Sequence, residues 1–303
     1  MRSTTPFRSN IAAWFACAAL TGIAPMAGSS AIGQTSPIAS AFEAVRHGRL
    51  AVVADLKLGA ADVPAVARFL DDGNEDVRRE AIVLLIKLGE PACRALKPAL
   101  VDAAADLRER AARGIHGNCP MPETARIADL DSDLRRSVEM GNAAAAALLL
   151  LGRFDNDATR SFLESRITGR DRAVKLNSWN PPVPQRLAAA VGGISVAAPS
   201  AEAVVAQGLG PVNEAEFIAL TLGDIHAVAR LAPLLKLLDD QRTVASGTPS
   251  GATPQRRICD LAVDSLVSRL SLQPSFPVRA ADRYTGAEIE RVRDLAAAAV
   301  AKG

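Results

Sequence analysis

The stretch DVRREA at residues 76–81 recurs as DLRERA at residues 106–111, and a weaker copy, DLRR, begins at Asp133. Self-similarity of this kind is the sequence signature of a repeat protein. In the first copy, apolar residues from Val77 to Leu88 follow the spacing of one helical face, and others widen that face almost around the helix. Such a helix is predicted to be buried between neighbours on both sides.

Signals that end and begin helices surround the first copy. Gly89 is placed to end its helix, and Pro91 suits the first turn of a partner helix expected over residues 91–101. Asp76 is expected to cap the N-terminus of the first helix. Arg78 is expected to reach an acidic group on the adjacent repeat. Each copy is therefore predicted to form part of a helix pair.

The spacing of aspartate, arginine, alanine and leucine, with Leu-Gly at the helix end and a proline opening its partner, resembles a HEAT repeat. The second copy keeps Asp106, Arg108 and Ala111, but it has Ile115 at the leucine position and Gly114 inside the helix. The resemblance implies a fold and no particular activity, because HEAT-like families include scaffolds, carriers, adaptors and a few lyases. The matching residues of the first copy are Asp76, Arg78, Ala81, Leu85, Leu88, Gly89 and Pro91.

Composition and pattern extend the helical prediction along the chain. Aromatic residues make up only 4% of the sequence, and alanine, leucine, valine and arginine dominate, which favours closely packed helices over a β-sandwich. The predicted class is all-α, an α-solenoid of about six HEAT-like helix pairs. Further pairs are expected over 42–57 with 63–69, 142–154 with 158–167, 185–192 with 201–207, 214–222 with 228–238, and 257–270 with 286–301.

The first residues have the order of a secretory signal peptide. Arg2 and Arg8 precede an apolar run from Ile11 to Leu20, and small residues follow at 28–31. The run is shorter than the roughly 20 apolar residues of a membrane-spanning helix. We expect residues 1–31 to be a signal peptide and residues 32–303 to form a single HEAT-like domain; the alternative is an uncleaved anchor.

The charge balance excludes some partners. The chain has 35 lysines and arginines and 33 acidic residues, and Arg2 and Arg8 are the only charges before Glu43, so cleavage would leave 33 of each sign. Without a basic excess or stripe, we expect no binding to nucleic acid and, after signal cleavage, none to membranes. The alanine-rich composition with arginine preferred to lysine is typical of a high-GC bacterium. Export then predicts a periplasmic or secreted protein.

An exported location permits disulfides. Cys93 and Cys119 could join neighbouring helix pairs, or Cys93 could be a small buried hydrophobic residue. Cys259 has no obvious partner and is expected to be buried.

The most individual stretch lies towards the C-terminus, where a flexible loop at 241–254 is flanked by charged residues. It resembles the closing region of exported bacterial HEAT-repeat proteins of no established activity. Arg256 and Arg257 lie four and three residues before Asp260, so helical spacing would place them on one face. The charges would form either a binding patch beneath the loop or a structural ladder of ion pairs between repeats.

Trp179 lies in a second long connection, at 168–184, where Asn and Pro neighbours stop any helix. It is expected either to anchor an interface or to cover the end of the core. The candidate binding residues are Trp179, Asp239, Asp240, Arg242, Arg256, Arg257 and Asp260.

The spacing of the histidines predicts neither a metal site nor a nucleophile. His47, His116 and His226 lie far apart, and none belongs to a metal-binding motif. His116 is expected to interact with the C-terminal carbonyls of its helix. Asp224 could form an acid–base pair with His226, but it is better explained as the N-cap of the next helix. We assign no catalytic residue, metal or cofactor.

These patterns favour a non-enzymatic scaffold that presents a concave surface for protein–protein interaction in the bacterial cell envelope. One alternative is a lyase-type enzyme on the same scaffold, which a resemblance to bilin-lyase HEAT-like proteins permits. It would need an acid and a base, around His226, Asp239 and Asp260. Another is a dedicated inhibitor or chaperone of one exported partner, with Trp179 as its anchor.

Overall fold

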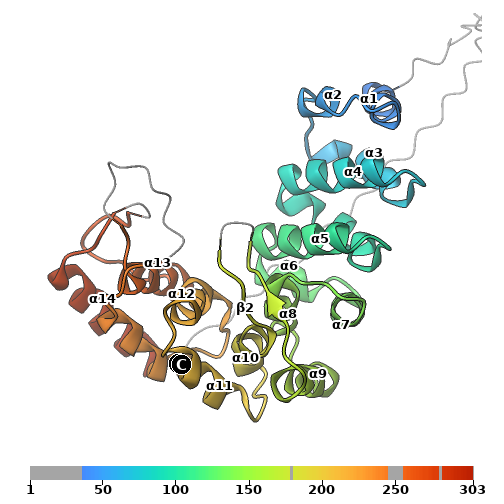
Figure 1. Ribbon diagram of the computed structural model, residues 1–303. Helices are drawn as coiled ribbons and strands as arrows, with labels where there is room; N and C mark the ends of the chain where they lie inside the picture. The colour runs from blue at the N-terminus through green and yellow to red at the C-terminus, as the bar shows by residue number, and fades with distance from the viewer. Residues whose placement is uncertain (1–35, 178–179, 245–254, 280–281, 303) are drawn as a thin grey trace, which may run out of the picture. The chain divides into compact units, whose positions relative to one another are not determined.

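The computed structural model describes residues 36–177, 180–244, 255–279 and 282–302, and these residues are mostly helical (Figure 1). The all-α class predicted from the sequence is confirmed. The chain from Pro37 onward forms one compact unit. The expected signal peptide at 1–31, Trp179 and most of the 241–254 loop lie outside the described residues.

Most α-helices begin and end close to where the residue patterns place them. The helix expected over 201–207 spans 201–208, for example, and that expected over 286–301 spans 286–300. The single helix expected over 42–57 was wrong: the chain forms one helix over 37–46 and another over 51–54, and Gly48 between them has a φ of 79° that a right-handed helix does not contain. The α-helices are α1 (Pro37–Arg46), α2 (Ala51–Ala54), α3 (Val63–Ala67), α4 (Glu75–Leu88), α5 (Ala105–Asn118), α6 (Met121–Ala125), α7 (Leu130–Glu139), α8 (Ala145–Leu151), α9 (Asp157–Thr168), α10 (Gln185–Ser195), α11 (Ala201–Gly208), α12 (Val212–Thr221), α13 (Ile258–Arg269) and α14 (Gly286–Val300).

Two expected partner helices are 3₁₀-helices rather than α-helices. Pro98 lies inside the first and Pro233 inside the second. Proline has no backbone N–H, and its ring clashes with the preceding turn of an α-helix. The tighter 3₁₀ winding is therefore found in both segments. The 3₁₀-helices are η1 (Ala60–Asp62), η2 (Arg68–Asp71), η3 (Glu90–Ala92), η4 (Arg94–Val101), η5 (Leu222–Asp224) and η6 (Val228–Asp239).

The ends of α4 correct one expectation and confirm another. Asn74 is the N-cap: its side-chain oxygen accepts hydrogen bonds from the backbone N–H groups of Asp76 at 2.8 Å and Val77 at 3.3 Å. The prediction that Asp76 caps the helix was wrong, because the helix begins earlier, at Glu75, and Asp76 lies in its first turn. Gly89 ends the helix as predicted, with a φ of 70° that glycine adopts without strain.

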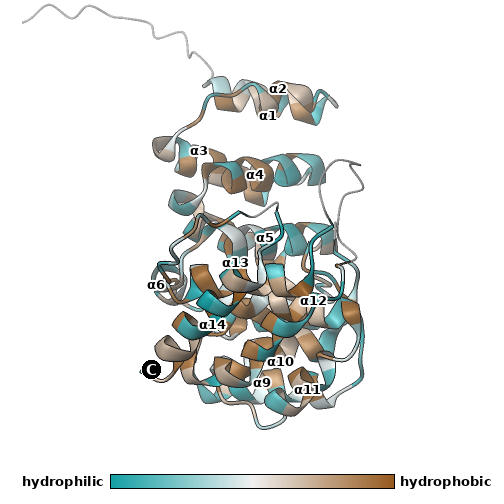
Figure 2. Ribbon diagram, turned by 90° about the vertical axis from the view of Figure 1, so that its left-hand side faces the viewer, coloured by the Kyte–Doolittle hydropathy of each residue, from teal (hydrophilic) through white to brown (hydrophobic). Residues whose placement is uncertain are grey.

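Successive helices pack against one another in chain order. α5 packs against α4 and η4 and also against α8, while α10 packs against both α8 and α9. All residues of α8 are buried. Figure 2 shows α4 changing from a hydrophilic first half to a hydrophobic second half, and its buried residues include Leu84 and Leu85. The core thus combines contacts between successive helices with contacts that skip one or two helices, such as that of α5 with α8.

α8 and α10 approach closely at two glycines. A Cβ added to Gly152, which follows α8, would lie 2.5 Å from the carbonyl oxygen of Gly192 in α10. A Cβ on Gly192 would in turn press on the carbonyl oxygen of Leu148. Both obstacles are backbone atoms, which cannot rotate away as a side chain does. Only glycine at these positions permits this crossing.

The long connection before α10 contains a small antiparallel sheet that the residue patterns did not predict. It consists of β1 (Ala173–Val174) and β2 (Val183–Pro184). Lys175 directly follows β1, and its backbone carbonyl oxygen accepts a hydrogen bond from the backbone N–H of Ala145 at 2.9 Å. Because α8 has no side-chain cap, this contact satisfies one of its free N–H groups.

A disulfide joins Cys93, between η3 and η4, to Cys119 at the end of α5. This decides between the two alternatives left open for Cys93. Cys259 is free and buried, as expected. In the part of the chain that the structure describes, no helix is both long and apolar enough to cross a membrane.

Candidate functional site

An arginine in each of the two clear repeats makes the same backbone contacts. Arg78 Nη1 donates to the carbonyl oxygen of Asp72 at 2.9 Å, and Arg108 Nη1 donates to that of Asp102 at 2.7 Å. Arg78 also grips the Asp102 carboxylate with Nε at 2.7 Å and Nη2 at 3.1 Å. The expected contact between Arg78 and an acidic group of the next repeat is confirmed.

Arg108 carries the connection onward. Its Nη2 donates to the carbonyl oxygen of Met140 at 2.6 Å, and its own carbonyl accepts from Asn142 Nδ2 at 3.2 Å. Arg78 therefore links α4 to the residues before α5, and Arg108 links α5 to the residue after α7. The Nη1 and Nη2 atoms of both guanidinium groups donate to the chain itself, so we assign both arginines a structural role rather than a ligand-binding one.

We expect Arg78→Met to lower the free energy of unfolding by about 2 kcal/mol. Methionine keeps the apolar stem but leaves the Asp102 carboxylate, only 7% exposed, without its paired donors. Urea denaturation of both proteins measures the difference.

Arg110→Met is the matched control, because Arg110 is 47% exposed and its ion pair with Asp106 is 4.0 Å long. We expect a change of less than about 0.5 kcal/mol there. Equal losses in the two variants would contradict a structural role specific to Arg78.

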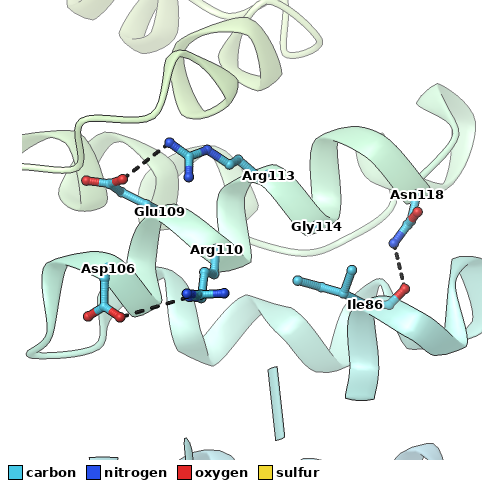
Figure 3. A pocket seen from close by; sticks show the side chains of 7 residues that line it. All are labelled: Ile86, Asp106, Glu109, Arg110, Arg113, Gly114 and Asn118. Carbon is cyan, nitrogen blue, oxygen red and sulfur yellow. Dashed lines mark hydrogen bonds and ion pairs between the residues drawn. The ribbon is translucent and has the colours of Figure 1, made fainter. Parts of the chain in front are cut away.

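A groove of about 400 Å³ opens beside α4 and α5 (Figure 3). Two ion pairs one helical turn apart lie along α5: Arg110 with Asp106 at 4.0 Å and Arg113 with Glu109 at 3.4 Å. The groove is lined by Ile86, Asp106, Glu109, Arg110, Arg113, Gly114 and Asn118, and we call it the α4/α5 groove.

Gly114 allows the two helices to meet at this groove. A Cβ there would lie 2.5 Å from Cγ1 of Ile86, so the absent side chain leaves room for the isoleucine of α4. At the other end, Asn118 Nδ2 donates to the carbonyl oxygen of Ile86 at 2.8 Å. The glycine that makes the second repeat degenerate in sequence thus has a packing reason.

The α4/α5 groove contains exposed charged side chains that are only weakly paired within the chain. Asp106 is 49% exposed and Arg110 is 47% exposed, so their ion pair contributes little to stability. Arg110, held this weakly, is free to exchange Asp106 for an external partner, whereas Asp106 also accepts a hydrogen bond from Arg79 Nε at 3.4 Å. Glu109 is held more firmly, because it also accepts a hydrogen bond from the backbone N–H of Ala143 at 3.3 Å.

The structure divides the C-terminal candidate residues among separate contacts. Asp240 accepts from Arg242 Nε at 2.9 Å, and Arg242 also donates to the carbonyl oxygens of Leu209 (2.8 Å) and Gly210. Burial raises the pKa of Asp240, but the hydrogen bonds from Arg242 outweigh it and hold that pKa below its usual value. Asp239 is 69% exposed and pairs with Arg293 of α14 at 2.6 Å.

Arg257 and Asp260 form a second, buried pair. The Asp260 carboxylate accepts from Arg257 Nη2 at 2.8 Å and from the backbone N–H of Tyr284 at 3.0 Å. Arg256 pairs instead with Asp264 at 2.6 Å. α13 begins at Ile258 with Arg257 as its N-cap, so the expected closeness of Arg257 to Asp260 is confirmed, whereas Arg256 reaches only the backbone carbonyl oxygen of Asp260, at 2.9 Å.

These contacts favour the structural alternative for the C-terminal charges. Each candidate has a partner within the chain: Arg242 reaches the end of α11, Asp239 reaches α14, and Arg257 reaches Tyr284. Trp179 and residues 245–254 of the loop lie in the stretches that the structure leaves undescribed. The residues suggested as acid and base of a lyase are also separated: Asp239 pairs with Arg293, Asp260 pairs with Arg257, and His226 belongs to another cluster.

That cluster was not predicted from the residue patterns. His116 Nε2 lies 2.7 Å from Asp224 Oδ1, and Arg153 Nη2 lies 3.8 Å from the same oxygen. Asp224 is therefore not the N-cap of the following helix, which starts at Val228. The His116 ring binds this carboxylate and not the carbonyls of its own helix; Arg153 binds one of those carbonyls, at 3.4 Å.

The surroundings of this cluster lower the pKa values of Asp224 and His226. Burial raises the pKa of Asp224, but His116 and Arg153 outweigh it and hold that pKa below its usual value. Burial, together with Arg153 and Arg269, lowers the pKa of His226 to about 4. The His226 Nε2 atom is buried without a hydrogen-bond partner. We call His116, Arg153, Asp224 and His226 the histidine–aspartate cluster.

Comparison with protein-family models yields no match for this chain, and neither does comparison with curated proteins. Functional conclusions therefore depend on the geometry of the chain itself. Within the described ranges, no group of three or more His, Cys, Asp or Glu side chains is arranged to hold a metal ion.

Proposed function

We propose that this protein is an exported HEAT-like α-solenoid scaffold that binds a protein partner through the α4/α5 groove. The solenoid part of the proposal is supported by the repeated backbone contacts of Arg78 and Arg108 and by helices that pack on their neighbours in chain order. Stacked pairs of this kind present extended surfaces rather than deep pockets.

Export to the bacterial periplasm or medium is supported by the Cys93–Cys119 bridge. Disulfides form and persist in oxidising compartments and are rare in the cytosol. The order of charged, apolar and small residues in the first 31 positions points the same way.

The groove itself carries the proposal for a protein partner. Its lining combines the apolar Ile86 and Gly114 with charged side chains of both signs. Arg110 is exposed and weakly paired, so a carboxylate of the partner can replace Asp106. The nearly equal numbers of acidic and basic residues on the chain suit a protein partner better than a polyanion.

A charge reversal tests this groove. We expect Arg110→Glu to lose a partner that wild type captures from envelope extract, and to bind that purified partner at least about tenfold more weakly. The substitution places a second negative charge beside Asp106 without removing a buried contact. Titration calorimetry with the purified partner measures the change in Kd.

Arg49→Glu is the matched control, because Arg49 is also exposed but lies outside the groove. It should bind as wild type does. Equal weakening by both substitutions would indicate a general electrostatic effect, and unchanged binding by Arg110→Glu would place the partner elsewhere.

A further inference from the structure

The histidine–aspartate cluster connects segments that are far apart in the sequence. His116 lies in the last turn of α5, and the contact from its ring to Asp224 of η5 spans 108 residues. Arg153, just beyond α8, joins the same carboxylate and also donates to the carbonyl oxygen of Cys119 at 2.8 Å. Opening this cluster would therefore release the 222–226 segment from α5.

The Asp224 carboxylate is outnumbered by the basic side chains around His226. The charged and titratable groups that act on His226 are Arg153 after α8, Arg269 of α13, Asp224 of η5 and His116 of α5. Arg269 is itself partly buried, and burial lowers its pKa. A proton on His226 would add a positive charge beside two arginines, while the single carboxylate is already engaged by His116.

His226 is also held by its backbone. Its N–H donates to Ser195 Oγ at 2.8 Å, and its carbonyl oxygen accepts from Arg269 Nη2 at 2.9 Å. The adjacent carbonyl of Ile225 accepts from Arg269 Nε at 2.9 Å. Any displacement of the protonated ring towards water therefore pulls on the short segment that carries Asp224.

We propose that residues 222–226 form an acid-operated latch, closed against α5 at neutral pH and opened when His226 takes up a proton. This latch is independent of the α4/α5 groove. Its function is conformational control: acidification of the surroundings would release η5 from the end of α5 while the rest of the helical core stays folded.

The lowered pKa of His226 determines how closure of the latch depends on pH. The closed form holds the pKa of His226 at about 4, below its ordinary value of 6.5, so the open form binds the proton more tightly. Closure is therefore fully favoured above pH 6.5 and is weakened as the pH falls towards 4. The ring is only partly buried, so solvent screening reduces the effect, and we expect about a tenfold rise in opening.

Hydrogen exchange with peptide resolution tests the latch. Purified wild type and His226→Gln are compared at pH 7 and pH 4, after correction for the intrinsic pH dependence of exchange. We expect exchange in the peptide covering 222–226 to rise about tenfold in wild type and less than about twofold in the variant. Peptides from α13 serve as the internal reference and should stay protected in both proteins.

Two further variants separate the latch from general effects of acid. His47→Gln is the matched control, because His47 is 67% exposed and pairs with Glu43 in α1; it should respond as wild type does. Asp224→Asn should open the segment already at pH 7. The proposal is overturned if 222–226 stays protected at pH 4 in wild type, if His226→Gln responds equally, or if α13 loses protection together with the segment.

Discussion

Gly192→Ala is expected to lower the free energy of unfolding by about 3 kcal/mol or more. The new Cβ would press on the carbonyl oxygen of Leu148, where α10 crosses α8. Because α8 is buried along its whole length, it cannot move away without disturbing the helices on its other sides. Urea denaturation followed by circular dichroism measures the loss, and Gly152→Ala should cause a similar one.

Gly117→Ala is the matched control, because this glycine also lies in a helix but a Cβ there meets no atom within 4 Å. Alanine is a better helix former than glycine, so we expect stability to be unchanged or to rise by up to about 1 kcal/mol. A Gly192→Ala protein as stable as wild type would show that the close crossing of α8 and α10 is not required.

Removal of the disulfide is expected to lower stability by about 3.5 kcal/mol. The bond between Cys93 and Cys119 closes a loop with a sequence separation of 26 residues, and it restricts the unfolded chain accordingly. It also anchors the end of α5, where the carbonyl of Cys119 accepts a hydrogen bond from Arg153 at 2.8 Å. The double variant Cys93→Ala/Cys119→Ala, compared with wild type in urea without reductant, measures this loss.

Cys259→Ala provides the control, because that thiol is buried and unbonded. Its loss should reflect only a small cavity, of about 1 kcal/mol. If the double variant were as stable as Cys259→Ala, the bridge would contribute nothing beyond the packing of two small side chains. A reductant should destabilise wild type and leave the double variant unaffected.

Local patterns were sufficient for most of the helices. The glycine after Leu88 ends α4, and apolar spacing locates α9, α11 and α14 to within a few residues. These features depend on backbone propensities and on which face of a helix is apolar, and neighbouring residues carry both. The link from Arg78 to the next repeat was also predictable, because the repeat spacing itself places the acidic partner nearby.

Other features depended on details of backbone geometry that residue spacing does not report. Asn74 and Asp76 are both good capping residues, and only the extended backbone at Asn74 decides between them. The sheet of β1 and β2 brings residues 173–174 beside residues 183–184, and the adjacent Lys175 bonds to the start of α8 through its backbone, which residue spacing does not predict.

The amino-acid pattern alone was enough to predict the helical class and the contact of Arg78 with an acidic residue beyond its own helix pair. It also left two alternatives for Cys93, a disulfide with Cys119 or a free and buried thiol. Only the tertiary structure shows that His116 contacts Asp224 and that Gly192 packs against the backbone of Leu148. It also shows which partner each C-terminal charge has, as in the pair of Asp239 with Arg293. The reason is physical: helix propensity and periodicity act over a few residues, whereas contacts across 108 residues exist only after the intervening helices have packed.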